Sequence, residues 1–95
     1  MSVGLISVCF LLLILPAKAS AQTADTYRQR ATEFSQAKSW DDAITNYRKA
    51  LDLEPNDAVT HYDLALALKY KGEDREALKE FQAATKLRPK WAEAH

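Results

Sequence analysis

The chain has 95 residues, of which 13 are basic and 13 acidic, so its formal net charge is zero. The two signs of charge are interleaved rather than gathered in a stripe, so the charge pattern gives no attraction for nucleic acid. Gly4 and Gly72 are the two glycines, which excludes a glycine-rich phosphate loop, and Cys9 is the single cysteine, which leaves no intrachain disulfide.

The amino terminus carries an apolar run over residues 3–15, followed by Pro16 and a series of small residues. This run is shorter than the roughly 20 residues that a membrane-spanning helix needs. An A-x-A cleavage site ends at Ala19 or at Ala21, so we predict that residues 1–21 are a signal peptide and that the protein is exported, periplasmic or secreted. No Lys or Arg precedes the apolar run, so an uncleaved leader that anchors the protein to a membrane is the alternative.

Residues 24–57 predict a pair of helices, because apolar residues recur at helical spacing in two stretches. These residues are Tyr27, Ala31 and Phe34 in the first stretch and Ala43, Ile44, Tyr47, Ala50 and Leu51 in the second. Ser39 is expected to cap the second helix, and Pro55 follows its end. Asn56 and Asp57 are expected to cap the helix that comes next.

Residues 58–91 predict a second pair of helices of the same kind. The apolar and packing positions are His61, Leu64, Ala65 and Leu68 in the first helix and Ala77, Leu78, Phe81, Ala84 and Leu87 in the second. Gly72 lies between them, where a left-handed residue ends one helix before the next begins. Ala65 and Ala77 are small, which allows the two helices to approach closely.

The two pairs of helices repeat with a period of 34 residues. Five residues of the first pair are matched 34 positions later, namely Ala43, Tyr47, Ala50, Leu53 and Pro55 by Ala77, Phe81, Ala84, Leu87 and Pro89. A generic four-helix bundle would not require the matched prolines, so an internal repeat is the better interpretation. Ala92 and His95 continue the register, so residues 92–95 are predicted to begin an incomplete third repeat.

The 34-residue pattern resembles the tetratricopeptide repeat (TPR). The matching residues are Leu64, Ala65, Leu68, Gly72, Ala77, Phe81, Ala84 and Pro89 in the second copy and Tyr27, Ala31, Phe34, Ala43, Tyr47, Ala50 and Pro55 in the first. Arg30, Lys38 and His61 depart from the pattern. The resemblance implies an all-α fold of two tandem helix-turn-helix repeats that form a short right-handed α-solenoid. It also implies a concave groove, lined by the first helix of each repeat, that binds a peptide or a helix of a partner protein.

Helical geometry separates one face of the second repeat's first helix from its packing residues. This face carries Val59, Tyr62, Leu66, Lys69 and Tyr70, and the corresponding face of the first repeat carries Asp25, Arg28, Thr32, Ser35 and Gln36. We predict a partner-binding groove made by Arg28, Thr32, Val59, Tyr62, Leu66, Lys69 and Tyr70, since Tyr and Arg are favoured interface anchors. The alternative is a solvated face whose tyrosines pack on a neighbouring repeat. The asparagine and lysine set with which some TPR domains clamp a terminal carboxylate is absent.

These features together predict an exported module for protein–protein interaction rather than an enzyme. Two helix pairs offer a shallow surface instead of a catalytic pocket, and His61 and His95 lack the spacing of metal ligands, so we expect no catalytic residue, cofactor or metal. The alternative function is a structural or oligomerisation fragment of a larger TPR array, without a ligand of its own. Self-association through an open edge at Leu78, Phe81 and Leu87 is a further expectation.

Overall fold

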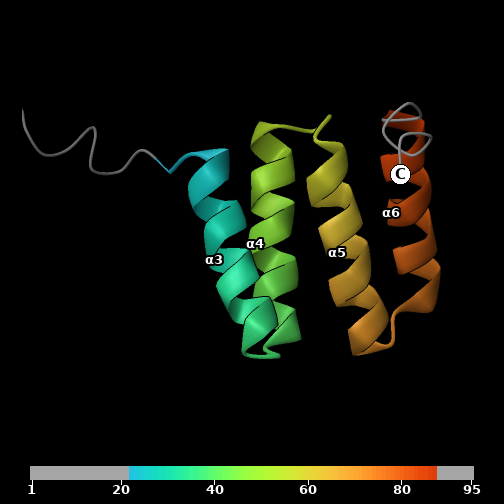
Figure 1. Cartoon of the computed structure of the whole chain (residues 1–95), viewed down its shortest axis with the longest axis horizontal. Helices are drawn as coiled ribbons and strands as arrows, with labels where there is room; N and C mark the ends of the chain where they lie inside the picture. The colour runs from blue at the N-terminus through green and yellow to red at the C-terminus, as the bar shows by residue number, and fades with distance from the viewer. Residues whose placement is uncertain (1–21, 88–95) are drawn as a thin grey trace, which may run out of the picture.

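A computed structural model describes residues 22–87, and all of the regular structure in that range is helical (Figure 1). The helices in chain order are α3 (Ala24–Gln36), α4 (Trp40–Leu53), α5 (Ala58–Lys71) and α6 (Asp74–Leu87). The predicted all-α helical-repeat fold is therefore confirmed. The predicted leader, the repeat proline Pro89 and the expected start of a third repeat at residues 92–95 lie outside the described residues.

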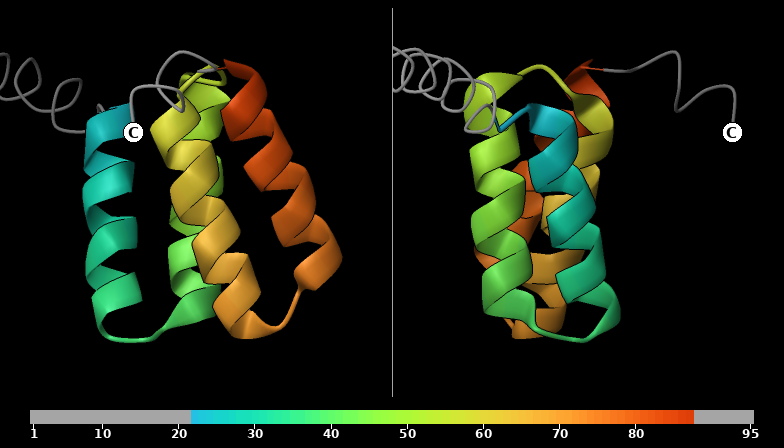
Figure 2. Two further views of the ribbon diagram at one scale, coloured as in Figure 1. Left: turned by 45° about the vertical axis from the view of Figure 1, so that its right-hand side comes forward. Right: turned by 90° about the vertical axis from the view of Figure 1, so that its left-hand side faces the viewer.

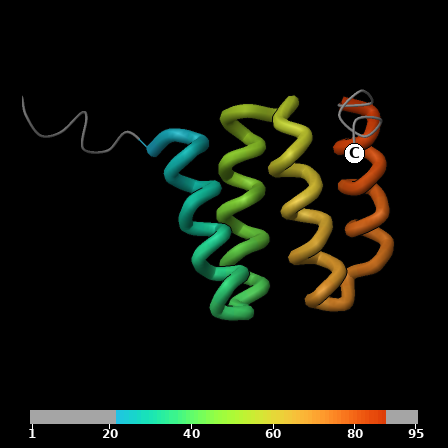
Figure 3. Tube along the Cα trace, in the orientation of Figure 1, coloured from blue at the N-terminus to red at the C-terminus, as the bar shows by residue number. Residues whose placement is uncertain are grey.

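The four helices form two layers. Helices α3 and α5 lie in one layer, and α4 and α6 lie in the other (Figure 2). Helix α4 packs against both α3 and α5, and α5 in turn packs against α6. The chain therefore folds as two successive hairpins, which the Cα trace shows side by side (Figure 3). None of these helices has the length and apolar character needed to cross a bilayer.

The turn inside each hairpin uses one left-handed residue. Gly72 has φ of 99° in the second hairpin, and Lys38 has φ of 61° at the equivalent place in the first. The amide that follows each of them donates to a carbonyl five residues back, from Ser39 to Phe34 and from Glu73 to Leu68, at 2.8 Å in both cases. The turn geometry is thus kept in the first repeat although its residue is a lysine.

The helix caps differ from the sequence expectation at two positions. Asp57 caps α5 as expected, since its carboxylate accepts hydrogen bonds from the amides of Val59 and Thr60. Asn56 is exposed and makes no capping bond in this part of the chain, so that prediction is wrong. Ser39 stands at the N-cap position of α4, but its hydroxyl donates to the Asp42 carboxylate instead of accepting from the helix. Its ψ of 76° lies outside the extended region from which an N-cap side chain accepts helix amides.

The core is centred on α5, which is sandwiched between α4 and α6. Leu64, Ala65 and Leu68 are buried as predicted, and Thr60 and Ala67 are buried as well. The sequence pattern predicted a single buried face for this helix. Because two neighbouring helices cover it, the buried surface of α5 is wider than one amphipathic stripe.

Candidate partner-binding groove

A shallow groove runs between α3 and α5. Its lining residues are Asp25, Arg28, Gln29, Thr32, Glu33 and Gln36 from α3, with Asp63 from α5. The α3 members are spaced by three, four and seven residues, which brings them to one side of that helix. We call this surface the α3–α5 groove. It joins two predicted residues, Arg28 and Thr32, with two carboxylates that the sequence analysis did not include, Glu33 and Asp63.

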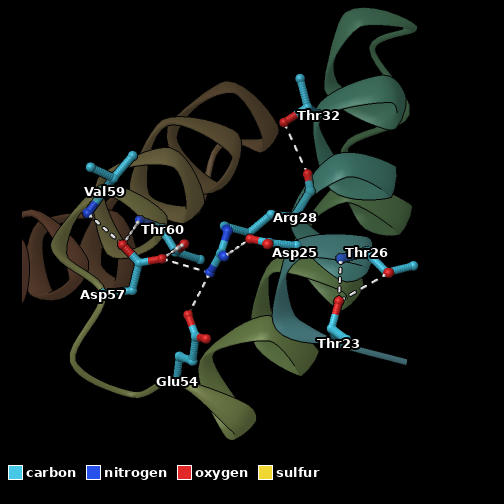
Figure 4. Close-up of polar contacts among 9 residues, drawn as sticks. All are labelled: Thr23, Asp25, Thr26, Arg28, Thr32, Glu54, Asp57, Val59 and Thr60. Carbon is cyan, nitrogen blue, oxygen red and sulfur yellow. Dashed lines mark hydrogen bonds and ion pairs between the residues drawn. The ribbon is translucent and has the colours of Figure 1, made fainter. Parts of the chain in front are cut away.

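Arg28 is held inside the groove by three carboxylates (Figure 4). One guanidinium nitrogen donates to Glu54 at 2.9 Å and to Asp57 at 2.7 Å, and the other donates to Asp25. The hydrogen bond with Glu54, reinforced by Asp25 and Asp57 and opposed by partial burial, raises the pKa of Arg28. This cation therefore ties α3 to the start of α5, and its charge is already compensated within the molecule.

Asp57 is the hub of this network. Besides capping α5, its carboxylate accepts the hydroxyl of Thr60 at 2.6 Å and the guanidinium of Arg28. Thr60 is completely buried, so this bond satisfies a hydroxyl that water cannot reach. Burial alone would raise the pKa of Asp57, but the hydrogen bonds from Thr60 and Val59 and the charge of Arg28 outweigh it and hold the pKa below its ordinary value.

Asp63 has the opposite environment. It is half-buried on α5, it lines the groove, and no hydrogen bond or ion pair joins its carboxylate to another residue of the range 22–87. Burial, with the negative charge of Asp57, raises the pKa of Asp63. A sequence signal for this residue existed, because Asp63 falls four positions after Val59 and three before Leu66 and so shares their helix face.

The five predicted α5 residues form the exposed side of that helix. Val59, Tyr62 and Tyr70 are 43%, 39% and 64% exposed, Lys69 is exposed and Leu66 is half-buried. None of the five lines the α3–α5 groove, and Lys69 lies instead beside Leu78 and Phe81 of α6.

The tyrosines also pack inside the molecule. Tyr70 stacks on Trp40 of the preceding repeat with ring centroids 5.1 Å apart, and Tyr62 meets Phe81 of its own repeat edge-on at 5.5 Å. Packing on a neighbouring repeat is therefore found for Tyr70, whereas Tyr62 packs within its own repeat.

The histidine at the first helix of the second repeat is structural. One ring nitrogen of His61 lies 2.8 Å from the carbonyl oxygen of Pro55, and the other lies 2.6 Å from the carboxylate of Glu80. These contacts join the loop before α5 to α6. Within residues 22–87 no group of three or more His, Cys, Asp or Glu side chains is arranged so that it could hold a metal ion.

Two protein-family models match the region of the chain that contains the 34-residue repeats. A model described as TPR repeat matches residues 32–72, and a model described as tetratricopeptide repeat matches residues 58–90. The chain carries tetratricopeptide repeats. TPRs are generally protein-interaction modules rather than enzymes. A search of curated proteins finds no match to this sequence.

Proposed function

We propose that this TPR protein binds a segment of a partner protein in the α3–α5 groove, and that the segment combines basic and apolar side chains. The observation that carries the proposal is Asp63, a half-buried carboxylate that lines the groove without a partner in residues 22–87. An ionised carboxylate in such a place is costly unless a cation approaches it.

The charge of the groove favours a cation over an anion. Asp25, Glu33 and Asp63 supply negative charge, and the one cation in the lining, Arg28, is shared among three carboxylates. A lysine or arginine of a partner would meet uncompensated negative charge here, whereas an acidic segment would be repelled. The absence of the carboxylate-clamp residues agrees with this polarity.

The α5 side of the same surface favours apolar contact. Val59, Leu66 and the exposed part of Tyr70 lie on the helix face that carries Asp63. A segment that places an apolar side chain here and a basic one against α3 would use both halves of the surface. Tyrosine is an effective anchor because it buries a large area at a small loss of conformational freedom.

A peptide titration followed by NMR tests the proposal. The probes are two peptides of nine residues with the same leucine and phenylalanine positions, one with lysine and one with glutamate at the polar positions. We expect the lysine peptide to shift the amides of Thr32, Asp63 and Leu66 in the isotope-labelled protein, and the glutamate peptide to leave them unchanged. Shifts confined to the outer side of α4, near Asn46, would contradict the proposal.

Two variants distinguish the effect of the groove charges on peptide binding from the effect of the overall charge of the protein. Replacing Glu33 by Gln and Asp63 by Asn together removes two negative charges from the groove, and we expect the lysine peptide to bind at least about tenfold more weakly. Asp52→Asn is the matched control, since Asp52 is an exposed carboxylate outside the groove lining. An equal loss in the control would mean that binding follows overall charge and not the groove.

We also propose that the protein acts outside the cytoplasm, on the strength of the apolar run at residues 3–15 and the small residues after it. Intact-mass measurement of the exported protein should find a chain that starts at Ser20 or at Gln22. Recovery of the full-length chain alone, in the membrane fraction, would favour an anchored protein instead.

A further inference from the structure

Arg28 is the one cation among the residues that line the α3–α5 groove. It shares this lining with Asp63, but none of its hydrogen bonds or ion pairs within residues 22–87 goes to Asp63. Its guanidinium instead bonds to Glu54 and Asp57, at the junction of the two repeats (Figure 4). The position of the Arg28 side chain therefore decides whether the charge of Asp63 is compensated within the molecule or left for a partner.

Two of the three carboxylates around Arg28 gain less from it than a carboxylate without a partner would. Asp57 already accepts hydrogen bonds from the amides of Val59 and Thr60 and from the Thr60 hydroxyl. The side chain of Asp25 is 84% exposed, and an ion pair in that setting contributes little because water competes for both charges. These two contacts alone therefore give only a limited preference for the observed position of Arg28.

The third carboxylate, Glu54, pairs with Arg28 alone. The bond between them, 2.9 Å long, is the only hydrogen bond of the Glu54 side chain within residues 22–87, and it is the largest of the causes that raise the pKa of Arg28. Glu54 stands at the C-cap of α4 and is not part of the groove lining. Any effect of Glu54 on the groove beyond that of its own charge is therefore transmitted by Arg28.

We infer that Glu54 is a positioning residue for partner binding, because it keeps Arg28 at the junction of the repeats and so leaves Asp63 open to a cation of the partner. The inference rests on the function proposed above. Arginine has many rotamers, and its carboxylate contacts select the one observed. Without Glu54, a rotamer that pairs Arg28 with Asp63 is favoured, since a half-buried carboxylate without a partner gains most from a cation. Arg28 would then compete with the partner's cation, and the groove would bind the partner more weakly.

Melting temperatures of the full chain test whether Glu54 keeps Arg28 away from Asp63. In the wild type Asp63→Asn should raise the Tm at pH 7, because burial penalises the charge of Asp63. In a Glu54→Gln background the same change should lower the Tm, because it removes the new partner of Arg28. The Glu54 side chain is 57% exposed, so glutamine there should leave the helices intact. Asp52→Asn is the matched background, since Asp52 is an exposed carboxylate of α4 that makes no bond to Arg28, and there Asp63→Asn should raise the Tm as in the wild type.

A rise in Tm in all three backgrounds would overturn the inference, because Glu54 would then act on Asp63 only through its own charge. Titration with the lysine peptide tests the consequence for binding. We expect a Kd at least about fivefold higher for Glu54→Gln than for Asp52→Asn, and equal affinities would also overturn the inference. Failure of the wild type to bind the peptide would contradict the proposed function and with it the role in binding, whereas the Tm comparison would still show whether Glu54 positions Arg28.

Discussion

At the scale of single residues, the first hairpin turn carries conformational strain that the second avoids. Lys38 adopts a positive φ at the place where the second repeat has Gly72. A residue with a Cβ is disfavoured in the left-handed region, and glycine is not. We expect Lys38→Gly to raise the free energy of unfolding by about 0.5–1 kcal/mol, measured by urea denaturation. Lys38→Ala keeps the strain and should stay near the wild type. If alanine stabilised as much as glycine, the side-chain charge would be the cause instead.

Asp57 and the groove residue Asp63 should affect stability in opposite directions. The pKa of Asp57 is lowered on folding, so its ionised form stabilises the protein above the unfolded pKa of about 3.9, and this contribution is lost as pH falls. Asp57→Asn should therefore lower the Tm at pH 7 and lose that effect in acid.

The sign reverses for Asp63, whose pKa is raised on folding. Its ionised form destabilises the native state at neutral pH, and the penalty disappears as pH falls through the folded pKa. Asp63→Asn should raise the Tm at pH 7 and converge with the wild type near pH 3. A lower Tm at pH 7 would show that the carboxylate has a stabilising partner.

The groove was only partly predictable from single residues. The helical spacing of residues identified Arg28 and Thr32 as members of one face of α3, because spacing along one helix can be read from the sequence. The pairing of Arg28 with Glu54 and Asp57, 26 and 29 residues away, depends on how closely α3 approaches the start of α5. The spacing of residues along one helix contains no information on how closely two helices approach. Arg28 was therefore predicted to contact a ligand, whereas in the structure it binds carboxylates at the junction of the two repeats.

At the scale of helices, close contact between α5 and α6 depends on small side chains. Ala65 is completely buried and Ala77 is 3% exposed. We expect Ala77→Leu to force the two helices apart and to lower the free energy of unfolding by about 1–3 kcal/mol. Lys79→Leu changes an exposed residue two positions away on the same helix, so it should be nearly silent. Thermal melts that ranked the two substitutions in the other order would show that the register of α6 is wrong.

The helices themselves were predictable because each carries local signals. Gly72 ends α5 and Asp57 begins it, and both act through bonds to neighbouring residues. The burial of Thr60 and Ala67 was missed because α5 packs on two sides. An amphipathic pattern identifies one buried stripe, and it does not report a second helix that covers the next one.

At the scale of the molecule, the 34-residue period was enough to predict the helical-repeat fold. Matched residues such as Tyr47 and Phe81 recur in register, and a repeated unit packs its copies in a repeated way. The chemistry of the α3–α5 groove was not predictable, because it depends on which charges stay uncompensated. The structure leaves this groove acidic.

The central claim is that the groove selects a basic and apolar segment, and a charge exchange tests it most directly. Glu33 and Gln36 are exposed residues of the groove lining, so lysine at both positions should leave the fold intact. Isothermal titration of the wild type and of this double variant with the lysine and glutamate peptides gives four dissociation constants. We predict that the wild type favours the lysine peptide by at least about tenfold and that the double variant favours the glutamate peptide. The same preference in both proteins, or none in either, would contradict the account.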